Sequence, residues 1–553
     1  MQRGLCLALL FPLFRAAPLP NIIFLQSDSF SGPLLDPTSP YFRVLRPGSF
    51  HARMLSNSSF NFRRHYVTSP ECVPSRTSML SGRYVSDTRT ANNGQGIARS
   101  TKTGALDSGC VAAWDAAQCA AFAAEQNVTE TLLDVMARAG YALRLFGRFD
   151  AGAGIIDDYA GDTSGSGFHG GVDIATQARG ANILGVSRPD PLDSTSQADG
   201  APFPEDDATV AAATAWLRRT PPRAPGQPPF FLWVGNYGPH GPYHTNASYM
   251  RLVDASAAPP LTIPALSAMH PYDRFQSITK NTFHDYSPAN LTFIRGAYWG
   301  AAAQALALFG ALLDAAEAAG HLDNTVVLYT SDHGENSMQW RMDDKNSLRE
   351  PSLRVPLLLA PFGVPGLGGG GVVGDLSSHL DVLPTLAELG GAPVPRYARG
   401  RSLVPYLRPG APPPPPRALV AAEYHSNLAN TGAFCVVSGH LKLITFGHGL
   451  PWFNASAYPP LLYNVSADPG ETTDLAAAQP AAVAALTAAL EGELGGLARI
   501  DAERMAEDRA LYEKWWRGAL ARPKLLAAFE ANWPGVGEAE IKARVEAWTG
   551  QPW

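Results

Sequence analysis

Charged residues are scarce in this sequence, and neither sign dominates. Asp, Glu, Lys and Arg make up 17% of the 553 residues, and the formal net charge is -6 at pH 7. Proteins that bind nucleic acid usually show a basic face or a basic overall charge, so this composition argues against a nucleic-acid partner. Because 46% of the residues are hydrophobic, the chain can form a large core, and wholesale disorder is excluded.

Long hydrophobic runs are also missing beyond the first residues. Residues 1–17 contain a basic residue at Arg3, an apolar run of about a dozen residues, and the small residues Ala16 and Ala17, which is the pattern of a secretory signal peptide. That run is too short to span a bilayer, and no later stretch reaches the roughly 20 apolar residues of a transmembrane helix. We therefore predict a signal peptide at 1–17 and no transmembrane segment.

Cysteine is rare, with five residues in the whole chain. Cys6 belongs to the predicted signal peptide, and Cys110 and Cys119 are close enough in sequence to form a small loop disulfide. Cys72 and Cys435 have no evident partner. An unpaired thiol in an oxidising compartment requires an explanation, and Cys72 lies in a polar, proline-containing segment rather than in an apolar run.

Six Asn-X-Ser/Thr triplets support the secretory route, since composition alone gives roughly two or three. Such triplets accept N-linked glycans on the surface of secreted proteins. They begin at Asn57, Asn127, Asn246, Asn290, Asn454 and Asn464. Together with the signal peptide, they predict a glycoprotein of the secretory pathway, either lysosomal or extracellular.

Apolar segments alternate with helical patterns through most of the chain. Residues 129–140 have a helical pattern that stops at a glycine, and an alanine-rich helix is indicated at about 296–320. Strands that end in polar residues are predicted within 21–28, 141–150, 228–243 and 324–335, and the third opens into a Gly/Pro loop at His240. This alternation predicts an α/β fold with a large, mostly parallel sheet flanked by helices.

A proline-rich segment divides the chain. RPGAPPPPPRA, from Arg408 to Ala418, has the composition of a stiff polyproline linker. Beyond it, 434–446 and 459–465 are typical of antiparallel strands, and the stretch after Pro480 is helical. We predict a large α/β domain at 18–408, a linker at 409–417 and a smaller α+β domain at 418–553.

Polar side chains follow each of the four predicted strands of the large sheet. They are Asp28, Arg148 with Asp150, His240, and Asp332 with His333. The carboxyl ends of parallel strands meet at one edge of a sheet, so we expect these residues to converge on one crevice. Two carboxylates on neighbouring strand ends could share a Ca²⁺ or Mg²⁺ ion, although an aspartate at a strand end more often caps a turn.

The segment CVPSRTSMLSGR, Cys72 to Arg83, resembles the signature of type I sulfatases, in which the cysteine of CxPSR is oxidised to Cα-formylglycine (3-oxoalanine). A CxPxR pattern arises by chance in such a chain with a probability of only about 0.03. Further segments are similar to sulfatase segments in family order: SDSFSG, GYALRLFGRFD, GPHGPY, AMHPYDRF, TSDHGE, KNSLREPSLRVPLLL, HLDVLPTL and LYNVSADPGETTDLA. Among them SDSF, AMHP and SDHG resemble the arylsulfatase K branch, which is similar to glucuronate-2-sulfatase.

The resemblance implies an alkaline-phosphatase-like catalytic domain and a nucleophile made from Cys72. A sulfated serine would be hard to hydrolyse, whereas an aldehyde hydrate has a second hydroxyl that can expel sulfate. It also implies one Ca²⁺ held by Asp28, Asp332, His333 and the modified Cys72, which would activate the nucleophile. Histidine is an unusual calcium ligand, so His333 could instead orient Asp332.

The same resemblance gives roles to three further residues. Arg76 would stabilise the hydrate and the metal ligands, Lys345 would bind the sulfate, and His240 would protonate the leaving alcohol. With only seven lysines in the chain, a lysine at this position is informative. The plain alternatives are a surface arginine, a solvated loop lysine and a loop histidine without a role.

Arg148 departs from the family pattern, which has lysine in an FGK segment. Arginine keeps the charge but is planar and is not deprotonated in proteins. The replacement could reflect the general use of arginine in this chain, a changed substrate or reduced turnover. Asp150 occupies the place of a family histidine and could act as a base or orient one. His169 could supply a histidine, but a loop residue without a role is favoured.

The sequence therefore predicts a Ca²⁺-dependent sulfatase that cleaves sulfate monoesters, above all 2-O-sulfates of uronic acids in sulfated glycosaminoglycans or other polysaccharides. Its partners would be the sulfated carbohydrate and, during maturation, the formylglycine-generating enzyme. Two alternatives remain open. One is a phosphate or phosphonate monoester hydrolase of the same superfamily, and the other is a catalytically weak carbohydrate-binding relative.

Overall fold

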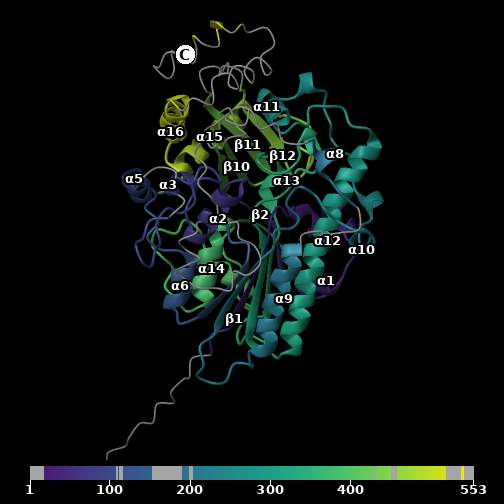
Figure 1. The fold of residues 1–553 in the computed structure, drawn as a ribbon, viewed down its shortest axis with the longest axis vertical. Coiled ribbons are helices and arrows are strands. Elements are labelled where there is room, and N and C mark those ends of the chain that lie inside the picture. The colour runs from purple at the N-terminus through teal and green to yellow at the C-terminus, as the bar shows by residue number, and fades with distance from the viewer. Residues whose placement is uncertain are drawn as a thin grey trace, which may run out of the picture.

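The computed structural model describes a large sheet and a smaller one, both visible in Figure 1. The described residues are 18–107, 110, 116–151, 190–197, 204–426, 429, 431–449, 458–517, 537, 539–540 and 543. The predicted signal peptide at 1–17, the glycosylation candidate Asn454 and the loop residue His169 lie outside them.

The large sheet contains eight strands within the described residues, in the order β3-β4-β1-β5-β7-β2-β6, with β8 paired to β2. Its strands are β1 (Asn21–Ser27), β2 (Phe60–Tyr66), β3 (Ala142–Gly147), β4 (Phe230–Gly235), β5 (Thr325–Ser331), β6 (Arg354–Val355), β7 (Leu357–Phe362) and β8 (Gly371–Ser378). The pairs β1–β4, β1–β5, β3–β4 and β2–β8 are parallel, whereas β6 and β7 run antiparallel to their neighbours. The predicted mixed, mostly parallel sheet is confirmed.

Helices cover both faces of this sheet, which explains why its central strands are apolar throughout. Every residue of β1 is buried. Ile23 and Leu25 pack toward α1 (Ser49–Met54), α9 (Pro204–Arg219) and α12 (Pro288–Ala318). Ile22 and Phe24 point to the other face, toward α2 (Cys72–Ser81), α6 (Leu132–Arg138) and α14 (Val382–Leu389). In Figure 1 the two helix groups lie on opposite sides of the strands.

Helix α12 is long and apolar enough to cross a membrane by length and composition alone. However, 83% of its most apolar stretch of 18 residues is buried inside the fold. Two consecutive helices, α15 (Pro480–Leu494) and the first part of α16 (Leu497–Arg517), would also be long and apolar enough if they were counted as one span. They are bent by 61° relative to each other, and no further candidate occurs within the described residues. Because α12 packs on the sheet through residues such as Ile294, Phe309 and Leu313, we interpret it as a core helix.

The smaller sheet is antiparallel and lies toward the C-terminus, with the order β12-β11-β10-β9. Its strands are β9 (Val420–Tyr424), β10 (Thr431–Ser438), β11 (Leu441–Gly449) and β12 (Leu461–Asn464). One face packs on α15 and α16 through Leu490 and Ile500. The other face shares a core with Tyr66 and Val355 of the large sheet. The predicted α+β arrangement after the proline-rich segment is therefore present, while the boundaries 18–408, 409–417 and 418–553 stay a prediction.

Short helices connect these layers. They are α3 (Val85–Thr88), α5 (Ala116–Gln126), α8 (Pro191–Ser194), α10 (Ala247–Met250), α11 (Pro271–Thr279) and α13 (Glu350–Leu353), with 3-10 turns η1 (Gly32–Leu34) and η2 (Pro40–Arg43) near the N-terminus. Cys110 is joined to Cys119 of α5 by a disulfide, with their Cα atoms 5.7 Å apart. Cys72 and Cys435 are the free cysteines of the described residues, and both are buried.

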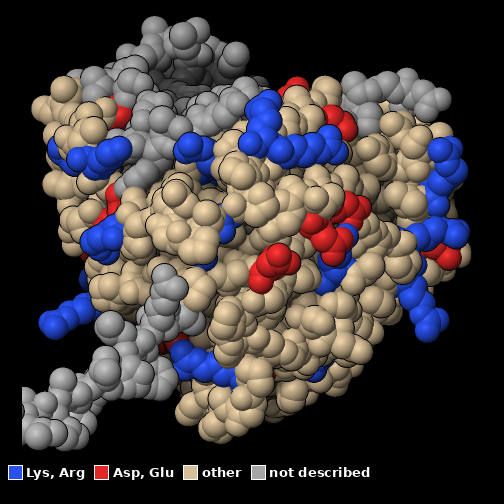
Figure 2. Space-filling model, turned by 90° about the horizontal axis from the view of Figure 1, so that it is seen from below, with Lys and Arg blue, Asp and Glu red and all other residues tan. Residues whose placement is uncertain are grey.

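The surface carries its charges in scattered groups. Figure 2 shows the end of the molecule that lies lowest in Figure 1, where Lys and Arg side chains are interspersed with Asp and Glu on a mostly uncharged face. Of the described glycosylation candidates, Asn57 and Asn127 are exposed, and Asn246, Asn290 and Asn464 are partly exposed. All five are therefore accessible at the surface.

Candidate active site

The register of the central strands brings two aspartates together. Ser27 at the end of β1 pairs with Ser331 at the end of β5, so the next residues, Asp28 and Asp332, leave the sheet side by side. Both side chains are completely buried. This is the crevice at the carboxyl ends of parallel strands that the sequence predicts.

Cys72 is the first residue of α2 and points into the same crevice. All ten residues of α2 are buried, and the helix ends at Gly82 in the left-handed conformation. The Cys72 Sγ atom lies 2.8 Å from Lys345 Nζ, 3.3 Å from His333 Nε2 and 3.7 Å from an Arg148 guanidinium nitrogen. Burial, reinforced by the charge of Asp28, raises the pKa of Cys72 well above its ordinary value, so the thiol is protonated near neutral pH.

Arg76 lies one helical turn after Cys72 and donates hydrogen bonds to both aspartates. Its Nε donates to Asp332 and one Nη to Asp28, both at 2.9 Å, and its other Nη donates to the Gln26 amide oxygen at 2.9 Å. The side chain is fully buried. Removing Arg76 would take from Asp332 its guanidinium partner and from Asp28 one of two, which is costly for buried charges, so Arg76 fixes the acid pair rather than lying on the surface.

Four donor side chains converge on one point. Single ligand atoms of Asp28, Cys72, Asp332 and His333 all lie within 4.8 Å of one another, and all four residues are buried. His333 donates from Nδ1 to the Gly334 carbonyl at 2.9 Å, which turns the Nε2 lone pair toward the cluster, as metal-ligating histidines require. Nε2 also lies 3.6 Å from a carboxylate oxygen of each aspartate. Two carboxylates with an imidazole fit a divalent cation.

The two carboxyl groups have different proton affinities. Burial and the charge of Asp28 raise the pKa of Asp332, despite the opposing charge of Arg76. For Asp28, burial acts in the same direction, but the charges of Arg148 and Lys345 outweigh it and hold its pKa well below the ordinary value. Asp28 therefore ionises more readily than Asp332.

Lys345 and His240 form a hydrogen-bonded pair above the thiol. Lys345 Nζ lies 2.6 Å from His240 Nε2, and the other ring nitrogen of His240 bonds to the Gly241 carbonyl. Burial and the charge of Lys345 lower the pKa of His240 to about 3, whereas Asp344 and Asp28 raise the pKa of Lys345 against the effect of burial. The imidazole is thus neutral and the ammonium carries the proton.

Arg148 and Asp150 follow strand β3 and complete the crevice. The Arg148 Nε lies 3.1 Å from Asp28, a second nitrogen donates to Asp150 at 3.1 Å, and the guanidinium lies 4.5 Å from the ring centre of Tyr237. A Cβ at Gly235 would stand 2.0 Å from the Arg148 carbonyl oxygen. The glycine that ends β4 is therefore required for the backbone of Arg148 to approach this closely.

The loop that carries His240 is held by a buried carboxyl group. Both Asp206 oxygens accept backbone N–H groups, from Tyr237 at 2.6 Å and from Gly238 at 2.7 Å. Asp206 is on α9, and burial raises its pKa to about 7. The sequence does not single out this residue, because one acid among several in PEDDATV has no distinguishing pattern.

The structure thus brings together every candidate that the sequence places at the strand ends and in the CxPSR segment. The described residues that sequence reasoning missed are Gln26, Tyr237 and Asp206. A signal exists for Gln26, because an amide inside the apolar strand NIIFLQS needs a buried partner. Tyr237 lies in the predicted loop GNYGPHGP, but its contact with Arg148 depends on β3 and β4 being neighbours.

A family model described as sulfatase matches residues 20–392, which is more than half of the chain. The chain belongs to the sulfatase family. Among curated relatives of this sulfatase, arylsulfatase K of Homo sapiens is 26% identical over 493 residues, covering 84% of this chain and 80% of the relative. Arylsulfatase K of Danio rerio is 28% identical over 484 residues, covering 83% and 81%. The resemblance to the arylsulfatase K branch is confirmed.

Solved structures share the fold of this sulfatase. The phosphonate monoester hydrolase of Agrobacterium radiobacter superposes with a TM-score of 0.62 at 20% identity, covering 86% of this chain and 95% of the other. A 2-O GAG sulfatase superposes with a TM-score of 0.56 at 19% identity, covering 86% and 92%. At these identities the likeness concerns the fold alone. Membership of the family makes this protein a sulfate-ester hydrolase, and the family implies a divalent metal and a formylglycine.

Proposed function

We propose that this sulfatase removes 2-O-sulfate groups from uronic acids of sulfated glycosaminoglycans or related polysaccharides, with Cys72 converted to formylglycine and Ca²⁺ as the metal. The observation that carries the mechanism is the position of Cys72. Its sulfur lies at a buried helix N-terminus, within reach of Lys345 and next to Arg148. A helix N-terminus and two cations around one atom suit the binding of a sulfate group.

The unmodified thiol is a poor candidate for the nucleophile. The raised pKa of Cys72 leaves little thiolate, and a thiolate is the reactive form of cysteine. An aldehyde hydrate at the same position would supply one hydroxyl to attack the sulfur atom, and a second whose deprotonation expels the sulfate. Water that hydrates the aldehyde again provides the oxygen consumed in each turnover.

The surrounding side chains have distinct tasks in this proposal. Lys345 and Arg148 bind the sulfate oxygens, and Arg76 keeps Asp28 and Asp332 in place. Asp28, Asp332, His333 and residue 72 would hold the cation. A bound divalent cation would lower the pKa of the attacking hydroxyl and offset charge on the sulfate.

The leaving alcohol needs a proton, and we assign it to the Lys345–His240 pair. His240 is neutral by itself because its pKa is about 3. The ammonium of Lys345, 2.6 Å from His240 Nε2, carries the proton. An N–H of this ammonium that is not bonded to Nε2 can donate to the leaving oxygen, while the imidazole orients the ammonium. The sequence-based role of His240 as proton donor is therefore proposed for the pair rather than for the imidazole alone.

The substrate class is supported by the comparisons. The curated relatives carry the name arylsulfatase K, and one structure of the same fold is titled as a 2-O GAG sulfatase. The glycosylation candidates Asn57 and Asn127 are exposed, in keeping with passage through the secretory pathway. We propose a lysosomal or extracellular location on that basis.

The decisive experiment is mass spectrometry of the tryptic peptide that contains residue 72, after co-expression with a formylglycine-generating enzyme. We expect the aldehyde or its hydrate at position 72, and loss of activity in Cys72→Ala. Cys435→Ser is the matched control, because Cys435 is the other free, buried cysteine of the described residues and should be dispensable for turnover. An unmodified cysteine in a fully active enzyme would refute the mechanism.

Substrate comparison separates the proposal from its rivals. We expect a 2-O-sulfated uronate disaccharide to be cleaved faster than the same disaccharide sulfated only on the amino sugar. An aryl phosphate hydrolysed faster than the matching aryl sulfate would favour the phosphoester hydrolase. Binding of the disaccharide without turnover, in protein verified to contain formylglycine, would favour the catalytically weak relative.

The metal is tested by chelation and re-addition. Treatment with a chelator should abolish turnover, and Ca²⁺ should restore it better than Mg²⁺, because a cluster with four side-chain ligands suits the larger ion. Asp28→Asn should weaken Ca²⁺ binding in calorimetry independently of any turnover. Equal restoration by Mg²⁺ would overturn the choice of Ca²⁺.

A further inference from the structure

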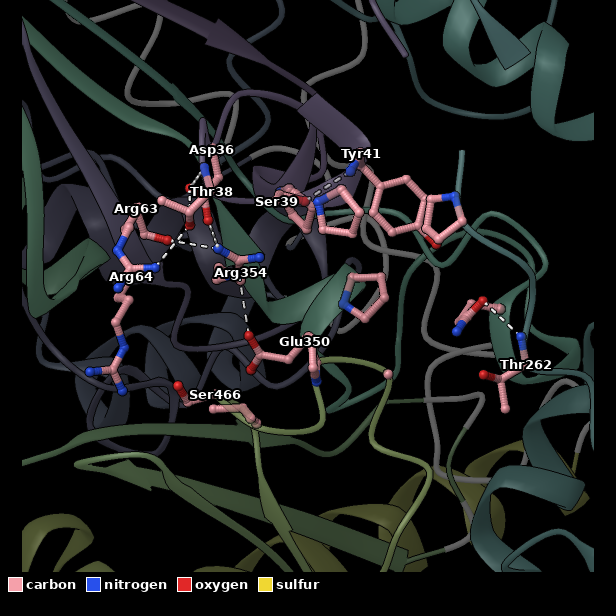
Figure 3. Close-up of a pocket in the computed structure, with 18 of the residues that line it drawn as sticks. Asp36, Thr38, Ser39, Tyr41, Arg63, Arg64, Thr262, Glu350, Arg354 and Ser466 are labelled. Carbon is pink, nitrogen blue, oxygen red and sulfur yellow. Dashed lines mark hydrogen bonds and ion pairs between the residues drawn. The ribbon is translucent and has the colours of Figure 1, made fainter. Parts of the chain in front are cut away.

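A second cavity, of about 460 Å³, lies between the N-terminal segment, β2 and loops of the smaller sheet. Figure 3 shows Asp36 and Tyr41 from the N-terminal segment on one side and Ser466 from the C-terminal part on the other. Among the described residues, those that line it do not include any of the candidate active-site residues. Its size is that of an ordinary small-molecule site, and it lies where ligand sites often occur, at the junction of two structural units.

Arg354 pairs with both acids of this cavity. One Arg354 nitrogen donates to Asp36 at 2.7 Å, and its Nε lies 3.3 Å from Glu350. Glu350 also pairs with Lys442 at 3.2 Å, which it shares with Glu471. Both acids of the lining are therefore already held in ion pairs.

Arg63 and Arg64 add positive charge that no acid matches. Arg63 donates to the Thr38 hydroxyl at 3.0 Å, and Arg64 donates to the Gly439 carbonyl. Within the described part of the chain, neither Arg63 nor Arg64 forms an ion pair with an Asp or Glu. Both partners are neutral oxygens, which orient the guanidinium groups without cancelling their charge.

Two consecutive strand residues normally point to opposite faces of a sheet. Here the pairing of β2 with β8 shifts register between Phe62 and Arg64, and such irregularities redirect side chains. Both Arg63 and Arg64 consequently line the same cavity. Three independent features thus involve Arg63 and Arg64: the shifted strand register, the neutral hydrogen-bond partners and the shared cavity.

The remaining lining combines hydroxyl groups with flat apolar surfaces. The hydroxyls and the rings belong to Thr38, Ser39, Thr262, Ser466, Tyr41, Pro40, Pro259 and Pro260. Hydroxyls can bond the ring oxygens and hydroxyls of a sugar, and guanidinium groups bind carboxylate or sulfate in a two-pronged manner.

We propose that the Arg63–Arg64 cavity is a second saccharide site, which binds one acidic sugar unit of the polymeric substrate through its sulfate or carboxylate. This proposal rests on the proposed polysaccharide substrate. Occupation of the cavity and the active site by one chain would raise the affinity for long substrates through effective concentration. Short substrates that reach only the active site gain nothing from it.

The test compares a sulfated polysaccharide with a small aryl sulfate as substrates of the formylglycine-containing enzyme. For Arg63→Gln/Arg64→Gln we expect KM for the polysaccharide to rise by about tenfold, with kcat and all aryl sulfate constants unchanged. Arg43→Gln/Arg46→Gln is the matched control, because these arginines are exposed and lie outside the cavity lining. If KM for the polysaccharide rises equally in the control, the polysaccharide is attracted by the overall positive charge of the protein rather than by the cavity, and the proposal is overturned.

A second variant guards against misfolding. Pro469→Trp fills the cavity from an exposed position without removing a charge or the Asn464 glycosylation triplet, and it should raise KM for the polysaccharide in the same way. If Pro469→Trp and the double arginine variant both leave KM for the polysaccharide unchanged, the cavity has no role in substrate binding.

Direct binding separates this proposal from the proposed function. A sulfated hexasaccharide is titrated into the full-length Cys72→Ala protein, with and without the two arginine substitutions. Arg-dependent binding with no sulfatase activity in the parent protein would refute the proposed function alone. Binding unaffected by the arginine substitutions, with aryl sulfate turnover intact, would refute the cavity proposal alone. Displacement of the hexasaccharide by an equal concentration of inorganic sulfate would show a simple anion site and would also refute it.

Discussion

Arg148 contacts an acid, a second acid and an aromatic ring at once. A guanidinium can do this because its donors point in several directions within one plane, and here they reach Asp28, Asp150 and Tyr237. The ammonium of a lysine is a single compact charge on a shorter chain. The arginine is therefore better explained by its three contacts than by a general preference of this chain for arginine.

We expect Arg148→Lys to lower kcat/KM for a sulfate ester by about tenfold or more, because a charged hydrogen bond contributes about 1.5–3 kcal/mol and at least one would be lost. Steady-state kinetics on one aryl sulfate measure the effect. Arg144→Lys, on an exposed position of the same strand, should have little effect. A faster Arg148→Lys enzyme would mean that arginine weakens the reaction.

Single residues of the candidate site could be predicted where a local pattern marks them. Asp28 and Asp332 end apolar strands, and Cys72 and Lys345 belong to recognisable segments. The Lys345–His240 contact could not be predicted in this way, because the two residues are 105 positions apart and meet only in the folded crevice. For the same reason, the neutral state of His240 is a property of the assembled site.

At the scale of elements, α9 and the loop after β4 act as one unit. Asp206 on α9 accepts two consecutive N–H groups of that loop, at Tyr237 and Gly238. Tyr237 lies against Arg148, and His240 lies against Lys345. Asp206 is thus a positioning residue, which acts on the reaction through the loop.

We expect Asp206→Asn to reduce turnover of a sugar sulfate by about tenfold and that of an activated aryl sulfate much less. An amide can accept only one of the two N–H groups, so the loop shifts, and a poor leaving group depends more on the proton supplied by the Lys345–His240 pair. Asp207→Asn, on the exposed side of the same helix, is the control. Equal losses on both substrates would indicate a purely structural role.

The same variant has a predicted pH signature. Burial raises the pKa of Asp206 to about 7, whereas aspartate in an unfolded chain titrates near 3.9, so between these values the folded state holds a proton that the unfolded state has released. The wild-type protein therefore loses up to about 1.4 kcal/mol of stability for each pH unit across that window. As the pH rises from about 4 to about 7, the free energy of unfolding of Asp206→Asn should therefore increase relative to that of the wild type. Above about pH 7 the difference should stay constant.

Urea unfolding across that pH range measures the difference. Asp207→Asn should show a smaller pH-dependent difference, since Asp207 is exposed. A constant difference between wild type and Asp206→Asn at all pH values would show that this carboxyl group is ionised throughout.

At the scale of the whole molecule, the two sheets are joined by a buried ion cluster. Lys442 of β11 is completely buried and pairs with Glu471 at 2.9 Å and with Glu350 of α13 at 3.2 Å. The shared core around Tyr66 and Val355 lies beside it. The smaller sheet is thus fixed to the larger one by both apolar and ionic contacts.

We expect Lys442→Met to destabilise the protein by about 3–5 kcal/mol, because two buried glutamates lose their common cation. Lys442→Met/Glu471→Gln should recover part of this loss. The free energy of unfolding in urea measures both variants, with exposed Lys102→Met as the control. Unchanged stability of Lys442→Met would mean that the cluster does not hold the sheets together.

The architecture could be predicted in outline because apolar strands alternate with helices along the chain. The direction of β6 and β7 could not. LLLAPF in β7 is an apolar run like that of a parallel strand, and only its pairing with β5 and β2 reveals the reversal. The contact between the two sheets was equally invisible, since a lysine in LKLITF gives no sign of burial.

The complete burial of Cys72 has a consequence for the order of events in the cell. Cys72 is the first residue of α2, whose ten residues are all buried, and its side chain has no surface accessible to another protein. An enzyme that oxidises this cysteine must therefore reach the segment before α2 docks on the sheet. The time available for maturation would then be set by the folding rate of the chain itself, and a variant that folds faster around α2 would leave a larger fraction of its molecules permanently unconverted.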